Sequence, residues 1–223
     1  MALRRVAIYG GTFDPVHNGH IEAARNVAKL FALDKVIFIP ACVPPHKRNA
    51  GVTSALHRFA MLALATQDDE ELRVSTAELD APEMPYTVET IARLQGELGS
   101  NSRLFFMVGA DSWSEITTWR NWQRLLTMCD QIVVTRPGYE LSTETLFTEQ
   151  ARVADVRGLS EKEISALMND GGKPRAFFTD AAMVDVSATA IREAARSLDS
   201  EKLKEMVPLA VASYIKKYEL YKE

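Results

Sequence analysis

Unbroken apolar runs alternate with amphipathic stretches along most of the chain. The apolar runs show little polar alternation, which is typical of strands buried on both faces of a parallel sheet. They predict strands at residues 4–10, 35–40, 72–77, 103–108, 131–135 and 175–179.

The stretches between these runs have the spacing of helices, and several start at a polar capping residue. We expect helices over residues 18–32, from a cap at Ser54 to about Thr66, and from a cap at Thr87 to Leu98. A further helix is expected in the tryptophan-rich segment after Ser112, and another over residues 160–169, where Ser160 and Glu163 form a capping box. Residues Val186–Thr189 lead into a helix that continues through Leu198, and two short helices are expected at the end.

This alternation predicts an α/β fold. We expect a Rossmann-like, doubly wound parallel sheet with helices on both faces and a C-terminal helical segment. The whole chain, residues 1–223, is expected to form one domain, of which residues 184–223 are the helical part. Residues 140–175 are the hardest to interpret.

Composition narrows the class of protein. The 223 residues are 47% hydrophobic and 25% charged, as in ordinary globular proteins, and no apolar run approaches the length of a membrane span. The net charge of −4 gives no basic field for nucleic acid. We therefore expect no membrane or nucleic-acid partner. Cys42 and Cys129 fit neither a metal spacing nor a disulfide framework, so we expect a cytoplasmic location.

The stretch from Gly10 to His20, GGTFDPVHNGH, carries the strongest chemical signal. It reads as strand, glycine turn and helix, and a helix N-terminus favours anions, phosphates above all. His17 and His20 both face that end if the helix begins by Val16–Asn18. Neither the dinucleotide fingerprint nor the P-loop is present. Phosphate would therefore be held by glycine backbone, helix N-terminus and imidazoles, and phosphate neighbours would favour the cationic imidazoles.

The alternative interpretation is the first βα unit of any doubly wound domain, with histidines that cap or pack. However, the string resembles the G-x-F-x-P-x-H-x-G-H signature of the nucleotidyltransferase superfamily, and most closely that of bacterial nicotinate-nucleotide adenylyltransferases. The resemblance implies that ATP contacts Gly10, Gly11, Thr12, Phe13, His17 and His20, and that the two histidines are catalytic.

Residues 186–192, VSATAIR, resemble the second signature of that family, I-S-S-T-x-I-R. The resemblance implies that Ser187, Thr189 and Arg192 hold the triphosphate, and that residues 184–223 close the nucleotide site. Arginine suits this role because its planar fork bonds phosphate in a bidentate manner. Ala188 departs from the family serine, so no role is transferred to it. The alternative is a plain serine cap with Arg192 in solvent.

Other segments resemble the family's substrate-binding positions. Asp111, in Gly109–Ser112, would reach the nucleotide sugar, although it could equally be a helix cap. Trp119 would stack on the pyridine ring, whereas Trp113 and Trp122 are expected in the core.

Three further segments would complete the pyridine nucleotide site. Tyr86 and Thr87, in a variant of the family's P-S-Y-T with Pro85 for serine, would read the carboxylate. Lys47 would meet the mononucleotide phosphate, and Arg136 would lie at the nucleotide end, although either could be a solvated loop residue. Because the glycine turn, Gly109–Ser112 and Ser187–Thr189 all follow predicted strands, one site at the sheet edge is expected.

The implied reaction is adenylyl transfer from ATP to nicotinate mononucleotide in NAD biosynthesis. An anionic phosphate is already a nucleophile, so no general base is needed, and Mg²⁺ would be held mainly by ATP phosphates, without a protein metal cage. Three alternatives stay open: nicotinamide mononucleotide as acceptor, another acceptor such as phosphopantetheine, and a regulator that binds ATP without turnover. The sequence leaves the oligomeric state open, a homo-oligomer included.

Overall fold

The structure is a computed structural model that describes residues 3–42, 51–81, 85–135, 152–169, 175–182 and 186–222. Within these ranges seven strands form one sheet, in which every pair of neighbours is parallel and the order is β3-β2-β1-β4-β5-β7-β6. The strands are β1 (Arg4–Gly11), β2 (Lys35–Pro40), β3 (Leu72–Val74), β4 (Ser102–Gly109), β5 (Asp130–Val134), β6 (Arg152–Asp155) and β7 (Arg175–Thr179). The predicted doubly wound α/β class is confirmed.

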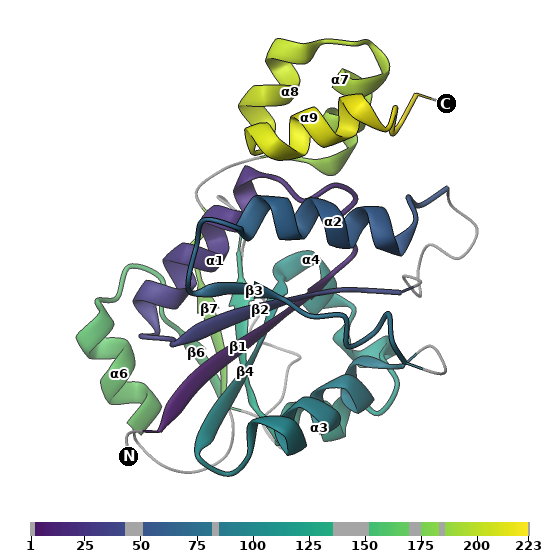
Figure 1. The fold of residues 1–223 in the computed structure, drawn as a ribbon. Helices are drawn as coiled ribbons and strands as arrows, with labels where there is room; N and C mark the ends of the chain where they lie inside the picture. The colour runs from purple at the N-terminus through teal and green to yellow at the C-terminus, as the bar shows by residue number, and fades with distance from the viewer. Residues whose placement is uncertain are drawn as a thin grey trace.

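Helices lie between most consecutive strands, β5 and β6 excepted among the described elements, and follow the last strand (Figure 1). They are α1 (Asn18–Leu30), α2 (Ala55–Thr66), α3 (Thr87–Leu98), α4 (Ala110–Ser114), the 3₁₀ helix η2 (Ile116–Thr118), α5 (Trp122–Met128), α6 (Glu161–Asn169), α7 (Ala188–Arg196), α8 (Ser200–Met206) and α9 (Leu209–Lys217). In the described part of the chain, no helix is both long enough and apolar enough to cross a bilayer.

The sheet separates two hydrophobic layers, because successive side chains of a strand point to opposite faces. Ala7 and Tyr9 of β1 pack with residues of α1, α2, α6 and the three C-terminal helices. Val6 and Ile8 pack on the other face with residues of α3, α4 and α5. Both faces of β1 are therefore covered, which explains why its sequence is apolar without alternation.

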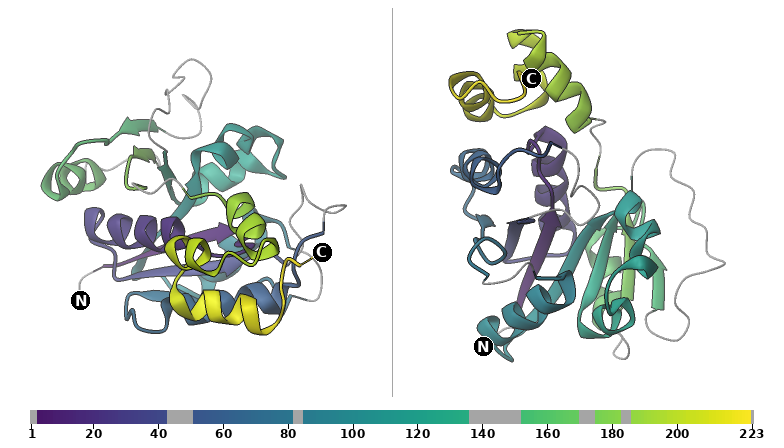
Figure 2. Two further views of the ribbon diagram at one scale, coloured as in Figure 1. Left: turned by 90° about the horizontal axis from the view of Figure 1, so that it is seen from above. Right: turned by 90° about the vertical axis from the view of Figure 1, so that its right-hand side faces the viewer.

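The chain reverses its winding direction between β1 and β4. From β1 it proceeds to β2 and β3 on one side, and it then crosses to β4, β5, β7 and β6 on the other. In open α/β sheets, ligands bind at this switch point, beyond the carboxyl ends of the strands. The helices α7, α8 and α9 lie together above α1 and α2 in Figures 1 and 2.

Some predictions of local structure are wrong in detail. Strand β6 was not predicted, since its short segment lies in the stretch that was hardest to interpret. Strand β3 ends at Val74 instead of Ala77, because the Ser75 hydroxyl accepts the Ala77 N–H (3.1 Å) and turns the chain.

The start of α3 also differs by one residue from the prediction. Tyr86, and not Thr87, is its N-cap, and Thr87 is the first helical residue. Glu89 accepts the Tyr86 N–H at 3.0 Å, a bond that secures the helix start. By contrast, Ser54 caps α2 as predicted, and Ser160 and Glu163 exchange the predicted capping bonds.

Candidate active site

The loop between β1 and α1 packs tightly around the ring of Phe13. Phe13 is buried and has a φ of 50°, and its ring meets Tyr9 and Phe38. A Cβ on Gly11 would lie 2.8 Å from this ring, whereas a Cβ on Gly10 would make an ordinary 3.5 Å contact with Phe106. A methyl group at position 11 would therefore force the buried Phe13 ring to shift. The Phe13 side chain belongs to the core, which leaves its backbone as the part able to meet a ligand.

His17 and His20 form a stacked pair at the N-terminus of α1. His17 is the N-cap and its ring lies 3.6 Å from that of His20, at an interplanar angle of 26°. The prediction that both imidazoles face the helix start is confirmed. The His17 N–H donates to Nδ1 of His20 (3.3 Å), so in this arrangement the neutral His20 ring carries its proton on Nε2. Phe13 packs edge-on against His20, at 5.1 Å between ring centres.

The second predicted motif lies beside this loop. Ser187 is the N-cap of α7 and accepts the Ala190 N–H, so the predicted serine cap is present. Arg192 donates from Nη1 to the Asp14 carbonyl at 2.8 Å and from Nη2 to the Thr189 hydroxyl at 3.2 Å. A residue 178 positions away thus contacts the first motif directly, as expected for one site at the sheet edge.

The residues after β4 lie on the other side of the switch point. Tyr9 pairs with Met107, so the ends of β1 and β4 are neighbours, and the exposed Asp111 follows in the first turn of α4. Trp119 is partly buried and meets Phe106 edge-on at 6.1 Å, and the same Phe106 ring lies against Gly10. The Phe106 ring therefore lies between Trp119 and the glycine turn. Trp113 is fully buried, which confirms it as a core residue, whereas Trp122 is partly buried and packs against the same layer.

The start of α3 brings a cation that was not predicted. The Arg120 guanidinium lies over the Tyr86 ring, at 4.6 Å from its centre. Tyr86 and Trp119 pack against the same hydrophobic layer, and Thr87 opens the helix beside them. The tyrosine, the tryptophan and Arg120 thus gather near one surface. Two other candidates, Lys47 and Arg136, lie outside the described residues.

Sequence reasoning also missed a buried polar group behind the loop. Arg58 of α2 is 1% exposed and donates to the Thr12 carbonyl at 2.7 Å. Burial lowers the pKa of this guanidinium, and the charge of Asp14 acts in the opposite direction. Asp14 in turn bonds Tyr221 near the chain end. A proline-flanked aspartate and a tail tyrosine give no sequence signal for such a bond.

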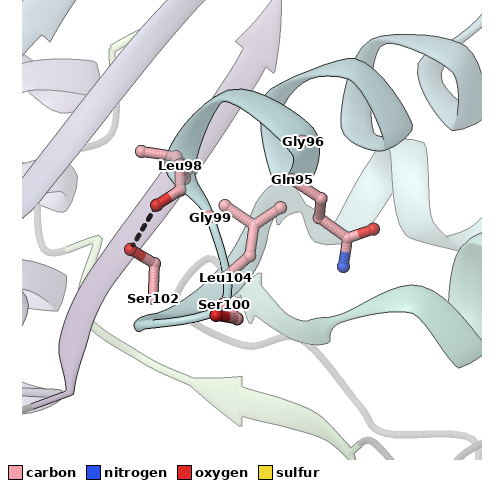
Figure 3. Close-up of a pocket in the computed structure, with 7 residues that line it drawn as sticks. All are labelled: Gln95, Gly96, Leu98, Gly99, Ser100, Ser102 and Leu104. Carbon is pink, nitrogen blue, oxygen red and sulfur yellow. Dashed lines mark hydrogen bonds between the residues drawn. The ribbon is translucent and has the colours of Figure 1, made fainter.

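The described ranges hold no protein metal cluster, and the cavity found in them lies away from the loop motifs. Those ranges contain no group of three or more His, Cys, Asp or Glu placed to hold a metal ion. A cavity of about 430 Å³ opens where α3 ends and β4 begins (Figure 3). It lies at the opposite end of β4 from the loop motifs and has no titratable lining residue: Gln95, Gly96, Leu98, Gly99, Ser100, Ser102 and Leu104.

The fold is similar to that of solved nucleotide adenylyltransferases. Nicotinic acid mononucleotide adenylyltransferase of Plasmodium falciparum, complexed with NaAD, matches with a TM-score of 0.71 at 18% identity, over 98% of this chain and 97% of that one. A putative nicotinate-nucleotide adenylyltransferase from Vibrio parahaemolyticus matches with a TM-score of 0.59 at 14% identity, over 99% and 96%. At these identities the matches establish the fold alone.

Sequence relatives are closer. Residues 8–194 match the family model described as cytidylyltransferase-like. A probable nicotinate-nucleotide adenylyltransferase of Thermoanaerobacter sp. is 37% identical over 98% of this chain and 95% of its own length. One from Moorella thermoacetica is 37% identical over 98% and 92%. With its two motifs in contact at the switch point, the chain belongs to the cytidylyltransferase-like family and, within it, to the nicotinate-nucleotide adenylyltransferases.

Proposed function

We propose that the protein transfers the adenylyl group of ATP to nicotinate mononucleotide, forming the deamido-NAD dinucleotide and pyrophosphate. The observation that carries this proposal is the contact of Arg192 with the Asp14 carbonyl. It joins a cationic side chain and the N-terminus of α7 to the loop that holds the stacked histidines. Relatives across the whole chain length support the choice of acceptor.

In the proposed reaction, a phosphate oxygen of the mononucleotide attacks the α-phosphorus of ATP. A new P–O bond forms, the bond between the α-phosphorus and the bridging oxygen breaks, and pyrophosphate leaves with the electron pair. The chain's task is to align two anions and to stabilise charge on the leaving group. His17, His20 and Arg192 are placed for this task, and the N-termini of α1 and α7 add fixed dipoles.

The donor set also indicates how a metal ion would take part. Two imidazoles and a guanidinium suit phosphate oxygens, whereas Mg²⁺ prefers oxygen ligands. We therefore propose that Mg²⁺ would be held mainly by the ATP phosphates and water, where it would supply neutralisation of phosphate charge.

We propose that the pyridine ring of the acceptor lies near Trp119. The partly buried indole is one ring from the glycine turn, and its Nε1 is buried with no hydrogen-bond partner among the described residues. Tyr86, Thr87 and Arg120 stand at the same surface, where the helix start and a cation favour a carboxylate. This surface favours nicotinate over nicotinamide.

The assay that tests the function is pyrophosphate release by the purified protein with ATP and Mg²⁺. Nicotinate mononucleotide, nicotinamide mononucleotide and phosphopantetheine are supplied in parallel. We expect rapid release with nicotinate mononucleotide alone. Equal rates with both pyridine nucleotides would overturn the assignment of acceptor. Binding of ATP without release in any arm would instead indicate a regulatory nucleotide-binding protein.

The compartment that we propose is the cytoplasm. Both cysteines are free thiols, as a reducing environment would leave them. Burial raises the pKa of the Cys129 thiol to about 12, which keeps that thiol unreactive.

A further inference from the structure

Asp14 is the buried carboxylate of the first motif, and no role in the reaction has been assigned to it. It is 6% exposed and stands between Gly11 and His17. Its Oδ1 accepts the Tyr221 hydroxyl at 2.8 Å, its Oδ2 accepts the Thr53 N–H at 3.2 Å, and its carbonyl accepts Arg192. Three distant parts of the chain thus meet on one loop residue.

The arginine behind the loop strengthens the same arrangement. Besides the Thr12 carbonyl, Arg58 donates to the carbonyls of Thr53 (2.9 Å), Ala41 (2.6 Å) and Cys42 (3.1 Å). These carbonyls belong to the loops that follow β1 and β2 and to the residue before the cap of α2. A buried cation therefore holds the backbone just before Asp14, at Thr12, and also holds Thr53, whose N–H donates to the Asp14 carboxylate.

Tyr221 comes from a part of a chain that is usually frayed. It lies beyond α9, two residues from the end of the chain, and its side chain is nevertheless half-buried. Its φ of 70° is a conformation that residues with a Cβ rarely adopt. Burial, followed by the charge of Asp14, raises the pKa of the phenol, so the hydroxyl stays protonated as a donor at neutral pH.

The C-terminal helices are tied to the core at other points as well. The Asn18 side chain donates to the Glu205 carbonyl (3.0 Å), and His57 of α2 bonds the Tyr214 hydroxyl (2.9 Å). These contacts hold the helical part over α1 and α2, as Figure 2 shows, but neither reaches the loop at Asp14. The Tyr221 hydroxyl does reach this loop, because it bonds Asp14, the residue whose carbonyl also accepts Arg192.

We propose that Tyr221 is a positioning residue for adenylyl transfer, an inference that rests on the function proposed above. Through Asp14 its hydroxyl sets where the first loop meets Arg192, and so the spacing between Arg192 and the histidine pair. A shift of about 1 Å in a positioning group can cost about 10²-fold in rate, because the charges then miss the transition state. The tail of the chain is by this account part of the phosphate-binding machinery.

The experiment compares Tyr221→Phe, which deletes one oxygen, with Tyr218→Phe as the matched control. Tyr218 is on the same tail, is 48% exposed and contacts Tyr214 and Lys217. We expect Tyr221→Phe to lower kcat about tenfold to hundredfold while KM for the mononucleotide changes less than about threefold. Tyr218→Phe should stay within about twofold of the unmodified protein.

Several readouts separate positioning from stability. Kinetics are measured well below the melting temperature of each variant, and ATP affinity is measured directly by calorimetry. If Tyr221→Phe only lowers the melting temperature and keeps kcat, the proposal is wrong. If the unmodified protein binds ATP but releases no pyrophosphate, the proposed function fails. The positioning role is then tested by ATP affinity, which should fall for Tyr221→Phe and not for Tyr218→Phe.

A second variant covers the case in which Tyr221→Phe does not fold. Asp14→Asn keeps the shape and an acceptor oxygen but removes the charge, so it weakens the bond between Asp14 and Tyr221 at its acceptor. We expect a smaller fall in kcat, again without a change in KM for the mononucleotide. The double variant should lose little more than the worse single variant, because both act through one bond. An unchanged kcat for Asp14→Asn, or fully additive losses, would overturn the proposal.

Discussion

Two helix N-termini form the proposed phosphate site, and different contacts hold them in place. At α1 the cap residue His17 is 8% exposed, and the buried Phe13 packs beside the pair. At α7, Ser187 and Thr189 are exposed, and Arg192 links the helix to the loop by hydrogen bonds. The functional side chains at the first N-terminus are therefore held by packing in the core, whereas Arg192 at the second is held by hydrogen bonds, one of which reaches a residue far away in the sequence.

The comparison shows that two helix starts with the same proposed role can be held in place by different interactions. A substitution in the first region disturbs packing and chemistry together, because Phe13 packs against both His20 and the core residue Phe38. In the second region Ser187, Thr189 and Arg192 lie outside the core, so their substitution changes the position of charged and polar groups without disturbing core packing. The variants below test this difference, from the largest expected effect to the smallest.

Replacing His20 by alanine should have the largest effect on turnover. The imidazole is placed to stabilise charge on the phosphates in the transition state, so kcat should fall about 10²- to 10³-fold. The Kd for ATP should change less than about tenfold, as calorimetry would measure. His57→Ala, a histidine on α2 that bonds Tyr214, is the control and should lose only a few-fold. Equal losses in ATP affinity and turnover for His20→Ala would count against a transition-state role.

Arg192→Lys tests the second region. Lysine keeps the charge but has no planar fork, so it cannot bond the Asp14 carbonyl and Thr189 while it also contacts phosphate. Steady-state kinetics should show kcat/KM for ATP about tenfold to hundredfold lower, with a melting temperature close to the original. Arg196→Lys, on the exposed last turn of α7, should be nearly neutral. A neutral Arg192→Lys would mean that charge alone matters there.

Gly11→Ala tests the packing of the first region, with Gly10→Ala as its matched control. The new methyl group at position 11 would meet the Phe13 ring at 2.8 Å, whereas that at position 10 would lie 3.5 Å from Phe106. Overpacking of this kind costs about 1–3 kcal/mol of unfolding free energy. Urea unfolding should show that loss for Gly11→Ala and less than about 1 kcal/mol for Gly10→Ala. Equal losses would show that the Phe13 ring moves away freely.

The smallest expected effect is a pH dependence at Glu78. Burial raises the pKa of this carboxyl group, although the Thr90 hydroxyl donates to it at 3.0 Å. Because the folded protein holds the proton more tightly than the unfolded chain, the stability contribution of Glu78 is fully present below about pH 4.3. It is lost as the pH rises through the raised folded value.

Urea unfolding between pH 4 and pH 8 would measure this effect, with Glu78→Gln as the comparison. The free-energy difference between the unmodified protein and Glu78→Gln should move in favour of the glutamine variant as the pH rises. A difference that moves the other way would mean that the charges of Arg58 and Arg93 outweigh burial.

Much of the framework could be predicted because it depends on local patterns. Unbroken apolar runs identify strands covered on both faces, and β2 and β7 have the predicted bounds. The glycine–histidine string placed His17 and His20 correctly because a helix start fixes residues three apart on one face. The N-cap of α3 was misplaced by one residue because threonine is the commoner cap, while here the Tyr86 backbone bonds Glu89.

The amino-acid sequence by itself determined the parallel α/β architecture, the paired imidazoles and the two helix starts of the proposed phosphate site. These follow from the spacing of neighbouring residues, which acts over one turn or one strand. Only the tertiary structure decided that Arg58 is buried against the Thr12 carbonyl and that Tyr221 reaches Asp14 across 207 positions. Such contacts form only after the sheet has brought distant segments together, so no local pattern encodes them.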